Sequence, residues 1–456
     1  KQLDKLARES LTPFKDDPHL LGYFTDNELG WWDDTLFLYY LKQPAHNVTR
    51  RVLLRLLREH YSDDFARLQR DFDTGSARSF EALERDARLT LKPGGRGMAV
   101  INKFTFKLAE RYYRLMHDTI RRYDKHHLIL GDRYHDFYPQ AVARAARRYV
   151  DVISTNHGAD WTDGANARFY FDTLHRLTGK PILVTEFYFC AMENRSGNKN
   201  RYENNPQGIT NFPTVLTQRE RAEGFRNNLT ALASLPYVVG AHWFQYYDEP
   251  THGRGDGENF NMGLVDIHDR PYEELTATAA SLNLTDLHRC SHPEPRPLRI
   301  PPAPANPTAG LRVWDKARAF VSSATKFPFA DLYACWEAHT LYLALYAMDY
   351  VDENLYAGGI IPESERMEWT IHLSGGRKPL RIRFGPGGKA TFEGTAVPCH
   401  EWSGWTRFTV LVELPASLLG KDRLRAGDSY RLRATLSSHS RAEHMKWDQT
   451  LYFDAP

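Results

Sequence analysis

The chain has 456 residues, a formal net charge of +2 and 42% hydrophobic residues, enough for two or three domains with cores of their own. The near-neutral charge and the lack of a basic stripe argue against a nucleic-acid or anionic-membrane partner, and no apolar run is long enough to span a bilayer. Four widely spaced cysteines, without a CxxC or Cys/His cluster, predict neither a zinc site nor a dense disulfide framework.

Up to about residue 285, short apolar runs alternate with helical patterns. Strands are predicted over 20–25, 128–131, 150–155, 181–185 and 238–243. A helix is predicted over 217–233, opened by the capping box of Thr217 and Glu220. Such alternation is typical of parallel β/α units, and polar residues follow every strand, where a (β/α)8 TIM barrel builds its active site.

The domain organisation predicted from these patterns has three parts. Residues 1–290 form the C-terminal part of a catalytic barrel, with a helical insertion at about 42–100. Residues 291–310 form a Pro-rich linker. Residues 311–456 alternate apolar and polar side chains at period two between Gly-rich turns, which predicts an antiparallel β-sandwich.

Two glutamates carry the chemical prediction. Glu28 follows the first strand directly and Glu186 the fourth. A carboxylate at a buried strand end is costly unless it is paired or used. Glycoside hydrolysis needs two carboxyl groups on either side of the scissile bond, about 5–5.5 Å apart in a retaining enzyme. Glu28 is therefore predicted to be the general acid/base and Glu186 the nucleophile; the alternative for each is a salt-bridged structural glutamate.

These motifs resemble those of clan A retaining glycoside hydrolases. The resemblance is closest to the family 50 β-agarases, with the family 42 β-galactosidases more distant. It rests on residues 22–29 (GYFTDNEL), 185–189 (TEFYF), 242–246 (HWFQY) and the loop 254–266. It implies a double-displacement mechanism without metal or organic cofactor. The C-terminal sandwich resembles family 9 carbohydrate-binding modules, with Trp336, Trp402 and Trp405 as candidates for stacking on sugars, although core packing is the favoured alternative.

The resemblance also implies substrate-binding residues. Asn27 is expected to contact the sugar 2-hydroxyl and the nucleophile, and Trp243 to form the floor of the sugar site. Asn27 or Tyr188 is expected to hold Glu186 ionised. The remaining candidates are polar residues after strands, each with a structural alternative: Arg133, His135, His157, Tyr188, Gln245 and Glu258. A core histidine is nearly as plausible for His157, and a network that stabilises the loop is equally plausible for Gln245, Asp248 and Glu258.

In the clan, the two catalytic glutamates follow barrel strands 4 and 7, so the five visible strands correspond to strands 4–8. Strands 1–3 are expected from a second chain, a cleaved N-terminal segment or residues beyond this sequence; oligomerisation stays open. The first residues, Lys1 to Asp4, are not a signal peptide. A secreted or periplasmic location is favoured, although no signal sequence is visible in this chain.

The leading functional prediction is a retaining β-glycosidase acting on a galactose-containing polysaccharide or oligosaccharide. One alternative keeps the chemistry but changes the sugar to a β-glucoside or β-mannoside. Another is a non-catalytic carbohydrate-binding protein that kept the barrel. The sugar, the linkage, and endo or exo action depend on loops that the sequence does not place.

Overall fold

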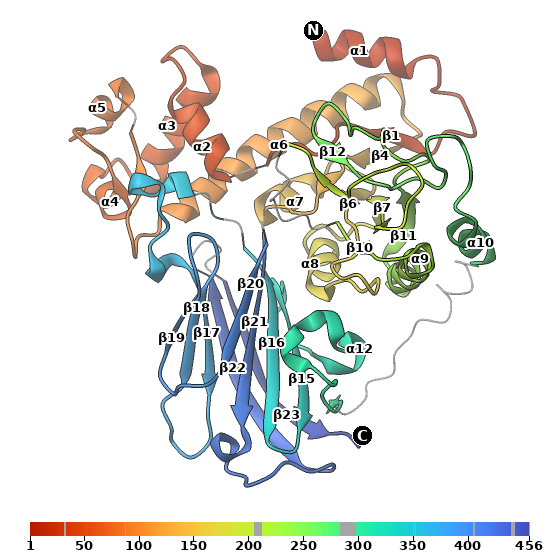
Figure 1. The fold of residues 1–456 in the computed structure, drawn as a ribbon. Helices are drawn as coiled ribbons and strands as arrows, with labels where there is room; N and C mark the ends of the chain where they lie inside the picture. The colour runs from red at the N-terminus through yellow and green to blue at the C-terminus, as the bar shows by residue number, and fades with distance from the viewer. Residues whose placement is uncertain are drawn as a thin grey trace. The chain divides into compact units, whose positions relative to one another are not determined.

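A computed structural model describes the chain except residues 32, 87, 205–211, 283–297, 350, 352, 405, 439–442 and 456. The chain divides into two compact units. The first comprises residues 1–29, 116–137 and 149–296, and the second comprises residues 30–115, 138–148 and 297–456. Figure 1 shows the elements of both, including the long helix α6 (Gly97–Tyr123), which contributes residues to each unit.

The first unit is built on parallel strands. Strand β1 pairs with β4, and a four-stranded sheet has the order β11-β7-β6-β5, with every pairing parallel. The strands are β1 (Gly22–Phe24), β4 (Leu128–Gly131), β5 (Tyr134–His135), β6 (Ile153–Asn156), β7 (Ile182–Phe187) and β11 (Val238–Trp243). The helices are α1 (Gln2–Leu11), α8 (Arg168–Thr178), α9 (Gln218–Ala233) and α10 (Glu273–Ser281).

The five predicted strands are all present, and neighbours in sequence are neighbours in space. The third begins at Ile153 rather than at residue 150, and β7 continues to Phe187, so Glu186 lies inside the strand instead of following it. Among the described residues, β1 and β11 do not pair with each other. The mixed α/β class and the sandwich are confirmed, whereas a closed barrel is not seen in this part of the chain.

Local chemistry explains how α9 is set against the site. Thr217 Oγ1 accepts from the amide of Glu220 at 3.2 Å, and Glu220 Oε2 accepts from the amide of Thr217 at 2.9 Å, so the predicted capping box is confirmed. Gly224 lies directly against the ring of Phe189, where a Cβ would come within 2.5 Å of it. This close approach brings the helix onto the segment that follows β7.

Short β-pairs shape the loops of the first unit. Strand β8 (Cys190–Ala191) pairs with β10 (Thr214–Val215), and β9 (Arg201–Tyr202) pairs with β12 (Glu258–Asn259). The second pairing joins the loop after β7 to the loop after β11. The segment 194–211 after β7 is therefore partly fixed by pairing, and its residues 205–211 lie outside the described part of the chain.

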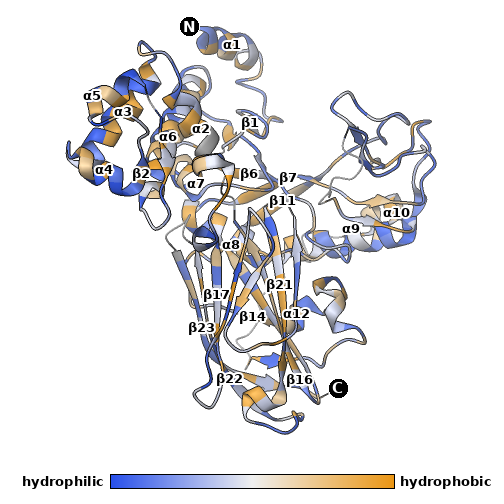
Figure 2. Ribbon diagram, turned by 60° about the vertical axis from the view of Figure 1, so that its left-hand side comes forward, coloured by the Kyte–Doolittle hydropathy of each residue, from blue (hydrophilic) through white to orange (hydrophobic). Residues whose placement is uncertain are grey.

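The second unit contains a helical region and the sandwich. Helices α2 (Asp33–Leu41), α3 (Val48–Tyr61), α4 (Phe65–Asp71) and α5 (Phe80–Arg85) surround a short hairpin of β2 (Phe72–Asp73) and β3 (Thr90–Leu91). Figure 2 shows hydrophobic and hydrophilic residues side by side on α3 and α4. Their apolar faces share one core with residues of the 351–361 loop, including Leu355 and Tyr356. Helix α7 (Gln140–Ala146) also belongs to this unit.

The sandwich has two sheets, ordered β13-β23-β22-β17-β18-β19 and β14-β15-β16-β21-β20. Every pairing is antiparallel except β13–β23. The strands are β13 (Arg299–Ile300), β14 (Phe320–Val321), β15 (Ala330–Glu337), β16 (Thr340–Met348), β17 (Met367–His372), β18 (Leu380–Phe384), β19 (Thr391–Glu393), β20 (Cys399–Ser403), β21 (Arg407–Pro415), β22 (Ser429–Ser438) and β23 (Glu443–Phe453), with helix α12 (Lys316–Ala319) beside them. The two inner faces form one core, with Trp369 fully buried.

One prediction for this region changes, and for Trp336 the favoured core-packing alternative holds. Part of the predicted linker, residues 291–297, lies outside the described chain, but Arg299–Ile300 is a sandwich strand, so the second half of that segment is not a free linker. Trp336 is buried and stacks on Phe453, with ring centroids 5.3 Å apart, which places it in the core rather than on a sugar-binding face. Trp402 is 40% exposed, and Trp405 lies outside the described residues.

The described residues contain neither a candidate membrane-spanning helix nor a candidate metal site. None of their helices combines the length and apolar character that crossing a bilayer requires. Nor do their His, Cys, Asp and Glu side chains gather in any group of three or more suited to a metal ion.

Candidate active site

The loops after β1 and β4 bring Glu28 to its position. The amide of Glu28 donates to the carbonyl of Arg133 at 3.1 Å, and that of Thr25 donates to the carbonyl of Gly131 at 2.8 Å. Glu28 and Arg133 both have a positive φ, 51° and 50°. Non-glycine residues adopt this conformation seldom, and strained backbone of this kind clusters at functional sites.

Asn156 joins the two predicted catalytic strands. Its Nδ2 donates to Glu28 Oε1 at 2.8 Å and to Asn27 Oδ1 at 3.2 Å, while its Oδ1 accepts from Thr185 Oγ1 at 2.7 Å. It lies in register with Glu186 across the β6–β7 pairing. Asn156 thus bonds to Glu28 and is the sheet neighbour of Glu186, and the charge of Glu28 is among the causes that raise the pKa of Glu186.

Arg133 is the partner of Glu186. Its Nη2 donates to Glu186 Oε1 at 2.5 Å and to the carbonyl of Thr185 at 3.2 Å. The expectation that Asn27 or Tyr188 holds this carboxylate is wrong for the structure. Asn27 instead accepts from Asn156, which occupies the end of the intervening strand.

The electrostatics of Glu186 combine opposing effects. Burial raises the pKa of its carboxyl to about 7, the Arg133 guanidinium opposes that rise, and the negative charges of Glu28 and Glu258 add to it. Its side chain is only 15% exposed. The carboxyl therefore changes charge near neutral pH, in a site where a second carboxyl stands close by.

His157 is a buried structural residue. Its two ring nitrogens form ion pairs with Asp136 and Asp160, and its ring stacks on Tyr170 with centroids 4.2 Å apart. Burial alone lowers the pKa of His157, but the two aspartate charges outweigh burial and raise it to about 9. Because the imidazole is 1% exposed and both nitrogens are engaged, the structure favours the core-histidine alternative over sugar binding. Its amide donates to the carbonyl of Glu186 at 2.9 Å, which supports strand β7.

The indole of Trp243 is firmly held. Its Nε1 donates to the carbonyl of Met262 at 2.9 Å, and its ring meets Phe187 and Phe225 edge to face at 5.3 and 5.2 Å. The guanidinium of the buried Arg221 lies 5.5 Å from its centroid. The side chain of the neighbouring Gln245 is partly exposed and bonds to no described residue.

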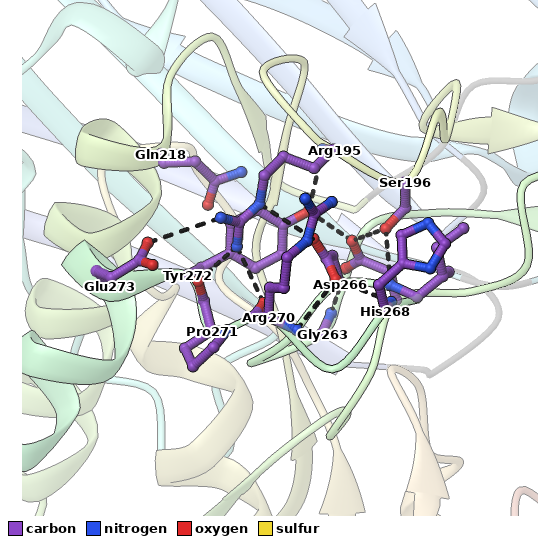
Figure 3. A network of polar contacts seen from close by, with 12 residues as sticks. Arg195, Ser196, Gln218, Gly263, Asp266, His268, Arg270, Pro271, Tyr272 and Glu273 are labelled. Carbon is purple, nitrogen blue, oxygen red and sulfur yellow. Dashed lines mark hydrogen bonds and ion pairs between the residues drawn. The ribbon is translucent and has the colours of Figure 1, made fainter.

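Figure 3 shows the polar network that fixes the loop after β11. Asp266 is buried and pairs with Arg195 at 3.2 Å and with Arg270 at 2.8 Å. Asp248 accepts from Ser196 at 2.7 Å and from Tyr272 at 2.6 Å. The loop-stabilising alternative therefore holds for Asp248, and the network ties the Trp243–Gln245 region to the loop after β7.

Glu258 belongs to a group of charges beside the nucleophile. It pairs with Arg254 at 3.1 Å, and its side chain is 18% exposed. The fully buried Glu249 accepts from the amide of Phe260 at 2.6 Å. Burial raises the pKa of Glu249, and a hydrogen bond with Glu258 adds to the rise. The charge of Glu258 is also among the causes that raise the pKa of Glu186, so Glu258 lies near the candidate site.

The other two predicted residues are positioned less decisively. His135 is half-buried on β5 and lies in register with Asn156. The ring of Tyr188 packs edge to face on Phe212 at 4.6 Å, and burial raises the pKa of its phenol well above its usual value. The charge of Glu28 is among the further causes that raise the pKa of Tyr188.

Sequence reasoning missed the functional weight of three residues. Asn156 and Thr185 are polar residues at the ends of buried strands, a signal that was available. Asp136, whose carboxylate favours the charged form of His157, follows the two-residue strand β5, which the sequence pattern does not predict. The sequence does not show how the strands are arranged in space, and only that arrangement lets Asn156 donate to Glu28.

Comparison with known proteins agrees with this geometry. The chain is 28% identical over 282 residues to β-agarase B, and 28% identical over 290 residues to β-agarase A, both of Vibrio sp. (strain JT0107). The chain is related to β-agarases. The similarity covers 59% and 58% of this chain and 27% of each relative, so the chain spans about a quarter of the length of the curated agarases it matches. No family model matches it.

Solved agarases have a similar fold. The crystal structure of an agarase is 26% identical with a TM-score of 0.52, covering 64% of this chain and 40% of that one. The structure of an exo-β-agarase is 27% identical with a TM-score of 0.53, covering 63% of this chain and 39% of that one. The predicted resemblance to agarases is therefore confirmed.

Proposed function

We propose that this chain carries the catalytic carboxyls of a retaining β-glycosidase that hydrolyses a galactose-containing polysaccharide or oligosaccharide. One observation carries the proposal: Glu28 accepts a hydrogen bond from Asn156, the register partner of Glu186, and Glu186 is mostly buried and held by Arg133. The relationship to β-agarases supports the choice of substrate class.

The residues suit the two steps of double displacement. Glu28 donates its proton to the glycosidic oxygen while the Glu186 carboxylate attacks the anomeric carbon, so the bond to the leaving sugar breaks as a glycosyl ester forms. Glu28 then takes a proton from water, whose oxygen attacks the same carbon and releases Glu186. Forming the ester removes the negative charge of Glu186, and Arg133 stabilises that charge when it returns.

The remaining polar groups are proposed to bind hydroxyls and to shape the pocket. Asn27 and Glu258 lie near the two glutamates, Gln245 follows β11 with a partly exposed side chain, and Trp243 offers a fixed aromatic surface. Arg133 acts on the nucleophile itself. His135 and Tyr188 are assigned to the pocket wall, because His135 lies on β5 in register with Asn156 and Tyr188 follows β7, the strand of Glu186.

We also propose that a (β/α)8 barrel is completed by strands next to β1 and β11, from a second chain or a further segment of the protein. Leu21 beside β1 and Val239 in β11 are 62% and 59% exposed. Parallel sheets are normally covered and their edges paired. Hydrogen exchange of β1 and β11 amides tests this: protection that appears only in the assembly supports it, and equal exchange in the isolated chain contradicts it.

Azide rescue tests the catalytic assignment. Glu186→Ala and Glu28→Ala should both lose hydrolysis of an aryl β-galactoside and of agarose oligosaccharides. Azide should restore turnover with α-galactosyl azide as the product of Glu186→Ala and β-galactosyl azide as that of Glu28→Ala, because azide replaces the nucleophile in one and the activated water in the other.

Glu223→Gln is the matched control, since this exposed carboxylate lies on α9. It should keep wild-type activity. If each variant gave the galactosyl azide of the opposite configuration, Glu28 would be the nucleophile and Glu186 the acid/base. Wild-type inactivity on every glycan that binds, including β-glucosides and β-mannosides, would identify a binding protein instead.

A further inference from the structure

A cavity of about 910 Å³ lies in the helical region of the second unit, apart from the residues of the proposed catalytic chemistry. Its walls are the end of α2, the turn between α2 and α3, and the segment from α5 to β3. The volume is at the upper end of the ~300–1,000 Å³ range of small-molecule sites. The cavity is therefore large enough for more than one sugar unit.

The charges on the cavity wall are unbalanced. Glu84 pairs with Arg58 at 3.6 Å, and Asp86 pairs with Arg88 at 3.4 Å, so both acidic residues of the wall have a partner. The cations Lys42 and Arg85 also line the cavity, and neither forms an ion pair with any described residue.

Arg50 adds a buried positive charge. It is 5% exposed and lines the cavity, and its guanidinium donates to the carbonyls of Leu41 at 3.1 Å and Glu84 at 2.7 Å. Within the described chain it has no carboxylate partner. Carbonyls satisfy its N–H groups but do not neutralise its charge, and a buried charge without a counter-ion is costly. The cavity thus has a net positive wall with one fixed cation in it.

An aromatic ring stands in the same wall. Tyr39 is 56% exposed, its ring meets that of Tyr40 edge to face at 5.1 Å, and its carbonyl accepts from Gln43 Nε2 at 3.3 Å. Exposed tyrosine rings offer an apolar face and a polar end to a ligand. The combination of an aromatic face with three unpaired cations suits a sugar ring that carries an anionic group.

We propose that this cavity is a second saccharide site, which binds a galactan unit carrying a sulfate ester or a carboxylate through Lys42, Arg50 and Arg85. That the ligand is a galactan rests on the proposed function, whereas that it carries an anionic group rests on the residues of the cavity alone. Charge-assisted hydrogen bonds hold the anion, and Tyr39 contacts the ring.

Isothermal titration of the full chain tests the proposal, using Glu186→Gln to prevent turnover. The probes are a sulfated galactan hexasaccharide, its desulfated form and sodium sulfate. The sulfated sugar should bind at least about tenfold more tightly than the desulfated one, and the difference should shrink with added sodium chloride. Lys42→Ala/Arg85→Ala should remove most of that preference; both side chains are exposed, so the fold should be kept.

Arg55→Ala is the control, because Arg55 is exposed on the same helix as Arg50 and does not line the cavity. It should bind as the parent does. Equal affinity for the two sugars, or an equal loss in the control, overturns the proposal. Displacement of the sulfated sugar by an equal concentration of sodium sulfate overturns the saccharide part. Absent hydrolysis by the wild type would refute the proposed function without affecting these binding results.

Discussion

Replacing the candidate nucleophile should make the protein more stable. Glu186 has a pKa raised from 4.5 to about 7, chiefly because burial penalises its charged form. Above pH 7 the folded protein must keep this carboxylate ionised in a mostly buried position, which penalises its charge. Glu186→Gln removes the charge and keeps the shape of the side chain, so it relieves that cost.

The magnitude follows from the shift. A difference of about 2.5 pKa units at 1.36 kcal/mol per unit sets an upper limit of about 3.4 kcal/mol. Some solvent reaches the side chain, so we expect a gain of about 1–3 kcal/mol at pH 8. For an acid whose folded pKa is raised, the penalty is absent below about pH 4.5, grows up to about pH 7 and is constant above it.

Urea unfolding of wild type and Glu186→Gln, followed by circular dichroism at about pH 4.5 and pH 8, measures this. Glu223→Gln, which removes an exposed carboxylate from α9, should change the free energy of unfolding by only a few tenths of a kcal/mol at either pH. The burial argument would be refuted if Glu186→Gln were less stable than the wild type at pH 8. It would also be refuted if the difference in free energy of unfolding between the two proteins were the same at both pH values.

Three further outcomes are expected. Arg133→Gln should move the acid limb of the kcat/KM profile, near pH 7 in the wild type, upward by about 1–3 units, because it removes the cation beside Glu186; an unmoved limb in a pH–rate series contradicts this. Asn156→Ala should lower kcat about 10–100-fold with little loss of stability, because Glu28 loses the amide that orients it; steady-state kinetics beside thermal unfolding separate the two effects. His157→Leu should cost about 3–5 kcal/mol near pH 6, since Asp136 and Asp160, whose side chains are 20% and 4% exposed, lose their counter-ion. The wild-type contribution should be fully present below about pH 6.5 and vanish as pH rises through about 9, and a variant equally stable at pH 6 would show that the pair is not needed.

The sequence by itself determined the strands, the capped helix α9, the sandwich and the two glutamates. Each has a local cause: period-two or continuous apolar runs, the Thr217–Glu220 box, and carboxylates at buried strand ends. The motifs at Glu28 and Glu186 also sufficed to identify the agarase relationship.

Only the tertiary structure decided the partners of those residues. That Asn156 rather than Asn27 joins the two glutamate strands, that Arg133 holds Glu186, and that His157 is buried between two aspartates all depend on register and on loop geometry. Asn156 and Glu28 are 128 positions apart and Arg133 and Glu186 are 53 apart, and no local pattern encodes the distance between their side chains. The excess of positive charge in the helical cavity arises in the same way, because pairing of the neighbouring acids elsewhere leaves Arg50 without a counter-ion.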